Sequence, residues 1–96
     1  EQVDTFLVFR VFDIALTDGK RAVKLMREAE EDNNPYATIG AWTKKAVDLF
    51  ASKKNAEKER RILKRLAEID MLLKQTNFSK DPWVVLESFL IELSSL

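Results

Sequence analysis

The sequence contains no cysteine and no histidine, and only two glycines and two prolines in 96 residues. Without cysteine and histidine, the chain cannot form disulfides, build zinc sites on these ligands, supply a thiol nucleophile or complete a Ser-His-Asp triad. Two isolated glycines cannot form a glycine-rich phosphate loop. These absences exclude most enzyme classes, so we predict no catalytic residue, no cofactor and no metal site.

The chain also lacks a net charge and a long apolar run. Sixteen Lys and Arg balance sixteen Asp and Glu, so no global charge indicates a nucleic-acid partner or an anionic membrane. There is no uninterrupted apolar stretch of membrane-spanning length, and the N-terminus lacks the basic-then-apolar layout of a signal peptide. We therefore expect a soluble cytoplasmic protein that has protein partners and no membrane contact.

The composition is that of one folded domain. Apolar residues make up 46% of the chain and charged residues 33%, a balance typical of a packed core. A chain of 96 residues is too short to divide readily into two domains. We expect residues 1–96 to form a single helical domain. Because the sequence begins with Glu1 rather than Met, we expect it to be the C-terminal fragment of a longer chain.

Apolar residues recur at helical spacing, which predicts an all-α fold, a compact bundle of about five helices. The predicted helical segments are residues 3–16, 20–31, 35–52, 55–75 and 82–96. A strand remains an alternative for the first segment because it is rich in Val and Phe. Asp4 and Asn55 are candidate helix caps, and Asn34-Pro35 and Asp81-Pro82 each place a capping residue before a proline suited to the first helical position.

Large apolar side chains are abundant in the terminal segments, and a small core cannot readily cover all of them. Trp42 is in phase with Ala46 and Leu49, so we assign it to the core. Trp83 is out of phase with its neighbours and is the better candidate for contact with a partner. The predicted partner interface comprises Phe6, Phe9, Trp83, Phe89 and Ile91.

Charge is uneven along the chain. Residues 53–65 hold seven basic and two acidic side chains, and helical spacing predicts a basic stripe made of Lys54, Lys58, Arg61 and Arg65. Such a stripe has three possible roles: it keeps one face of the helix in water, it contacts an acidic surface of a partner protein, or it binds the phosphates of a nucleic acid. The run Glu28, Glu30, Glu31 and Asp32 is interpreted as a solvated face rather than an acid-base or cation site. Asp70 and Lys74 are at ion-pair spacing.

Two groups of motifs resemble a known family. The first is Phe12-Asp13, Gly19, residues 22–26 (AVKLM) and Asn34-Pro35; the second is residues 66–74 (LAEIDMLLK), Asp81-Pro82, Leu86-Glu87 and residues 89–93 (FLIEL). Together they resemble the C-terminal domain of the bacterial DNA polymerase III delta subunit, a clamp-loader protein, over most of the chain. The sequence departs from the family pattern in two places. Residues 53–61 replace a longer stretch, and Asn77 stands where a glycine is usual.

The resemblance implies a helical collar domain, the part through which five clamp-loader subunits pack into a ring. It implies a non-catalytic oligomerisation role in DNA replication, inside a complex that is a DNA-directed DNA polymerase, a nucleotidyltransferase. The implied partners are the gamma/tau and delta-prime subunits. The sliding clamp would be bound only through N-terminal domains absent from this sequence, and contact with nucleic acid would be indirect. Two alternatives stay open: a collar domain of gamma/tau, delta-prime or replication factor C, and a nucleic-acid-binding module that uses the basic stripe.

Overall fold

The computed structural model describes residues 4–51, 57–75 and 80–96. Within these ranges the chain forms five α-helices and one short 3-10 helix, and it has no strand: α1 (Thr5–Ala15), α2 (Gly19–Arg27), η1 (Glu30–Asp32), α3 (Pro35–Phe50), α4 (Glu57–Leu73) and α5 (Pro82–Leu93). The predicted all-α fold is confirmed, and the first segment is a helix rather than a strand.

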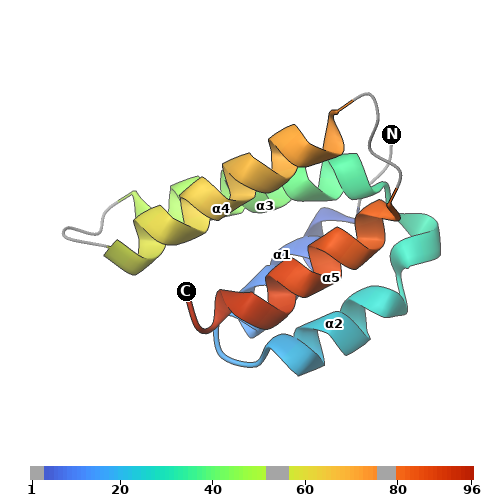
Figure 1. Ribbon diagram of the computed structural model, residues 1–96. Helices are drawn as coiled ribbons and strands as arrows, with labels where there is room; N and C mark the ends of the chain where they lie inside the picture. The colour runs from blue at the N-terminus through green and yellow to red at the C-terminus, as the bar shows by residue number, and fades with distance from the viewer. Residues whose placement is uncertain (1–3, 52–56, 76–79) are drawn as a thin grey trace.

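The helices form two groups that share one core. The long helices α3 and α4 lie side by side, and α1, α2 and α5 pack together beneath them (Figure 1). Both α1 and α5 contact α3, so these two helices join the groups. All five α-helices contribute buried apolar side chains to a single cluster. The expected bundle is therefore held by a common core, with α5 between α2 and the α3–α4 pair.

Side-chain caps start four of the five α-helices. Asp4 accepts a hydrogen bond from the Leu7 amide and Asp18 from the Arg21 amide, each at 3.1 Å. Asn34 accepts from the Tyr36 and Ala37 amides, and Asp81 accepts from the Trp83 amide. The predicted caps Asp4, Asn34 and Asp81 are confirmed, as are the two prolines that open α3 and α5. The candidate cap Asn55 lies outside the described residues.

Trp42 occupies the centre of the core, as predicted. Its side chain is fully buried, its Nε1 donates a hydrogen bond to the Val8 carbonyl at 2.9 Å, and its ring centroid lies 5.9 Å from that of Phe89. One residue therefore connects α3 with both α1 and α5. Ala46, expected on the same inward face, is also buried, as is Phe50, whereas Leu49, expected there too, is exposed.

Two residues fix the position of α2. Gly19, its first residue, lies so close to α5 that a Cβ atom there would be 2.6 Å from the Leu90 carbonyl oxygen and 2.8 Å from the Ile91 Cα. At the other end, the buried Asn33 donates to the Ala29 carbonyl and accepts from the Asp4 amide at 2.7 Å. The connection between α2 and α3 is thereby tied to the start of α1.

Candidate functional site

The structure separates the five residues of the predicted partner interface into three classes. Phe6 and Ile91 are exposed, with 78% and 47% of their surface accessible. Phe9 and Trp83 are partly buried against the core, and Lys45 Nζ lies 5.4 Å from the centre of the Phe9 ring. Phe89 is fully buried. Phe6 and Ile91 are therefore the members of the set that a partner could reach most freely.

The assignment of Phe89 to a partner surface is wrong for this structure. The inward face of α5 consists of Leu86, Phe89, Leu90 and Leu93, whose spacing of i, i+3, i+4 and i+7 forms one helical stripe. Phe89 lies at the middle of that stripe and packs against Trp42. Its ring is used by the core of this chain and is not accessible to another one.

The outward face of α5 is also apolar, a feature that the sequence prediction included only in part. Val84, Ser88 and Ile91 follow one another at i, i+4 and i+7 and line a groove between α5 and α2. Val84 is 55% exposed and was missed. The groove has a volume of about 330 Å³ and is completed by Val23, Arg27 and Glu87. The largely apolar composition of residues 82–93, broken only by Glu87, Ser88 and Glu92, was the signal that could have identified it.

Arg27 and Glu87, which line this groove, form an ion pair beside the carboxyl group of Glu30. Arg27 donates from Nε and Nη2 to Glu87 Oε1 at 3.2 and 3.1 Å. Burial, then hydrogen bonding with Glu87 and repulsion from Glu87 and Asp81, raises the pKa of Glu30 to about 7. Burial alone would raise the pKa of Glu87, but its hydrogen bonds with Glu30 and Arg27 outweigh this effect and lower it. Glu30 is therefore not the fully solvated side chain that the sequence indicated.

Stability should depend on pH through Glu30. Because its pKa is higher in the folded chain than the ordinary value of 4.5, its protonated form is stabilised by folding. That contribution is complete at pH values below the ordinary pKa and is lost as the pH rises through about 7. We expect the free energy of unfolding, measured with urea from pH 5 to pH 8, to decline in the wild type and to stay nearly level in Glu30→Gln.

The neighbours of Glu30 do not obscure this test. Because folding lowers the pKa of Glu87, its contribution to the free energy of unfolding is lost only as the pH falls through that lowered pKa. This lies below the pH interval measured. Arg27 stays protonated throughout, because hydrogen bonding to Glu87 raises its pKa further. Parallel pH profiles for the wild type and Glu30→Gln would contradict the prediction.

The basic stripe, for its described members, faces the C-terminal end of α5. Lys58 Nζ donates to the Ser94 carbonyl at 3.3 Å, Arg61 donates to the main-chain oxygen of Leu96 at 2.8 and 3.0 Å, and Arg65 donates to Glu92 Oε1. Cations at the end of a helix also interact favourably with its dipole. Lys54 lies outside the described residues. On the same helix, the predicted pair Lys74–Asp70 is confirmed at 3.1 Å.

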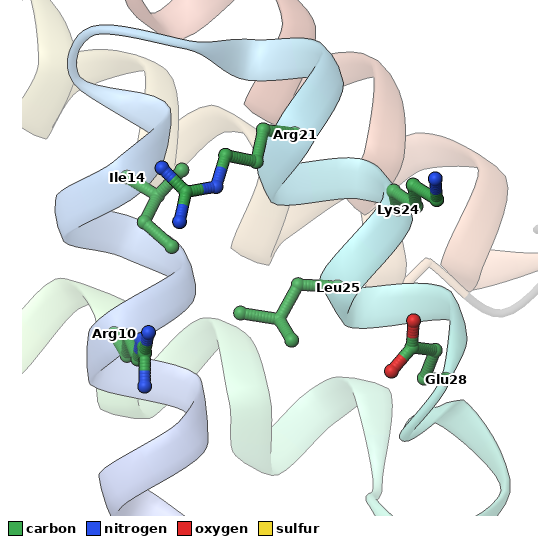
Figure 2. A pocket seen from close by; sticks show the side chains of 6 residues that line it. All are labelled: Arg10, Ile14, Arg21, Lys24, Leu25 and Glu28. Atoms are coloured by element: carbon green, nitrogen blue, oxygen red, sulfur yellow. The ribbon is translucent and has the colours of Figure 1, made fainter.

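A second pocket lies between α1 and α2 and was not predicted. It is lined by Arg10, Ile14, Arg21, Lys24, Leu25 and Glu28, and its volume is about 190 Å³. Figure 2 shows Arg21 and Leu25 reaching from α2 toward α1, where Arg10 and Ile14 lie, with Lys24 and Glu28 on the outer side of α2. Residues 1–32 carry a net negative charge, so a basic site there is not evident from the sequence. The cations form a group only because α1 and α2 pack against each other.

Comparisons of the chain with protein-family models, curated proteins and solved structures found no match. Over residues 4–51, 57–75 and 80–96, no three acidic side chains gather as a metal site would require. None of the helices in these ranges combines the length and the apolar character needed to cross a membrane.

Proposed function

We propose that this chain is a non-catalytic oligomerisation domain, the collar domain of a cytoplasmic DNA polymerase III clamp-loader subunit, with delta as the first assignment. Its role is to hold the loader together by packing against the gamma/tau and delta-prime subunits. The observation that carries the proposal is the outward apolar face of α5, where Val84 and Ile91 remain exposed although the helix already buries four large side chains.

The physical argument rests on the cost of that exposure. A helix that only covers its own core needs one apolar stripe and places polar residues opposite it. In α5 two further apolar side chains, Val84 and Ile91, line the groove toward α2 on either side of Ser88. Exposed apolar surface rimmed by polar groups, here Arg27 and Glu87, is typical of a protein interaction site. The motifs of residues 66–74 and 81–93, which carry the resemblance to clamp loaders, fall on α4 and α5.

The nucleic-acid alternative has less support. Lys58, Arg61 and Arg65 already donate to oxygen atoms of α5 and of the residues after it, so binding to phosphates would compete with these contacts. The collar domains of gamma/tau, delta-prime and replication factor C remain alternatives of the same class. They predict the same kind of surface with different neighbours.

The proposal is tested by mixing the chain with gamma/tau and delta-prime subunits from the same organism and measuring complex formation by sedimentation velocity. We expect a complex at micromolar concentration. Ile91→Asp and Val84→Asp should each weaken it at least about tenfold, because a buried unpaired carboxylate replaces an apolar contact. Val47→Asp is the matched control, since Val47 is similarly exposed at 49% but lies on α3.

Two results would count against this function. The first is the absence of a complex with any loader subunit at micromolar concentration. The second is an equal loss of binding in Val47→Asp and Ile91→Asp, with all variants folded by circular dichroism. Binding to duplex DNA that weakens steeply with salt would instead support the nucleic-acid alternative.

A further inference from the structure

The pocket between α1 and α2 brings together cations that have no acceptor among the described residues. Within the described part of the chain, the side chains of Arg10, Arg21 and Lys24 make no ion pair and no hydrogen bond. Other arginines do have acceptors: Arg27 bonds Glu87, Arg61 bonds the Leu96 oxygen and Arg65 bonds Glu92. With Glu28 as the one acidic side chain, the three positive charges leave the pocket lining at about +2.

The surroundings of these cations favour recognition of a doubly charged anion. Ile14 and Leu25 are partly buried and form the apolar part of the lining, beside the exposed cations. A guanidinium presents a planar fork of donors that matches phosphate or carboxylate oxygens. A phosphate monoester carries about −1.5 to −2 at neutral pH, close to the charge of the lining, whereas a single carboxylate carries half as much.

The pocket is small, with a volume of about 190 Å³, and apolar side chains lie beside the cations in its lining. A phosphate group that carries a carbon substituent would match both parts of this lining. The apolar side chains of Ile14 and Leu25 would contact the carbon substituent.

We propose that this pocket binds a small soluble phosphate monoester, with Arg10 and Arg21 as the phosphate ligands and Lys24, on the outer side of α2, as a nearby positive charge. The site is distinct from the α5 face and from the basic stripe on α4. Its occupant would link α1 to α2 on the side of α2 that faces away from the α5 groove.

The experiment is a titration of the isotopically labelled chain, followed by amide chemical shifts. The probes are phenyl phosphate, inorganic phosphate and benzoate. Phenyl phosphate should bind saturably and tightest of the three, with shift changes concentrated at residues 10–14 and 21–28. Arg10→Gln and Arg21→Gln should each weaken its binding at least about tenfold, because each removes a charge-assisted contact. Arg60→Gln is the control, since Arg60 is an exposed arginine on α4.

Three outcomes would overturn the proposal. One is the absence of saturable shifts in α1 and α2 with phenyl phosphate. Another is an equal loss of binding in Arg60→Gln and Arg21→Gln, which would show a general charge effect. The third is benzoate binding as tightly as phenyl phosphate, which would show that the second charge is not recognised. All three arginines are exposed, and unchanged amide shifts elsewhere would show that the variants keep their fold.

Discussion

Replacing Trp42 with alanine is expected to lower the free energy of unfolding by about 3–5 kcal/mol. The substitution removes the largest fully buried side chain, its contact with Phe89 and the hydrogen bond to the Val8 carbonyl. Native domains of this length are stable by roughly 5–15 kcal/mol, so a large part of the total would be lost. Urea unfolding followed by circular dichroism measures the change.

Trp42→Phe separates the two contributions of the side chain. The phenyl ring keeps an aromatic contact with Phe89 but cannot donate to Val8. We expect a smaller loss, about 1–2 kcal/mol. A loss below about 1 kcal/mol for Trp42→Ala, well outside the range for truncation of a buried aromatic residue, would mean that Trp42 does not hold the centre of the core.

Gly19→Ala is expected to destabilise the chain by about 1–3 kcal/mol, although alanine is the better helix former. A methyl group at residue 19 would lie 2.6 Å from the Leu90 carbonyl oxygen and 2.8 Å from the Ile91 Cα, and these main-chain atoms cannot rotate away as a side chain could. The helices α2 and α5 must therefore move apart. The same urea experiment measures the effect.

Gly40→Ala is the matched control and should have the opposite sign. Gly40 lies inside α3, and a methyl group there would meet nothing within 4 Å. We expect a gain of about 0.5–1 kcal/mol. Both substitutions change the entropy of the unfolded chain in the same way, so the difference between them isolates the contact of α2 with α5. Equal effects at the two positions would contradict this explanation.

The features predicted well from the sequence are local ones. The caps Asn34 and Asp81 and the prolines after them depend on neighbouring residues only, and both helices begin where predicted. In α4 the buried residues Ile62, Leu66, Ile69 and Leu73 lie on one stripe at helical spacing, and the other faces of this helix are largely polar. Strong amphipathic patterns and capping motifs therefore determine both the helices and most of their orientation.

The features that were missed depend on contacts between distant segments. In α5 most positions are apolar, so periodicity alone did not distinguish the buried Phe89 from the exposed Val84. Glu30 belongs to an acidic run, and its raised pKa arises first from burial and then from Glu87, far along the chain. The cations around the α1–α2 pocket are likewise separated in sequence. Such sites require the tertiary arrangement.

The two tryptophans have different surroundings, so their fluorescence reports on two different parts of the chain. Trp42 is sealed in the core, whereas Trp83 lies partly buried near the start of α5. A subunit that docks over this end of α5 would alter the fluorescence of Trp83 and leave that of Trp42 unchanged, whereas unfolding would alter both. Emission spectra can therefore distinguish assembly from loss of structure without any added label.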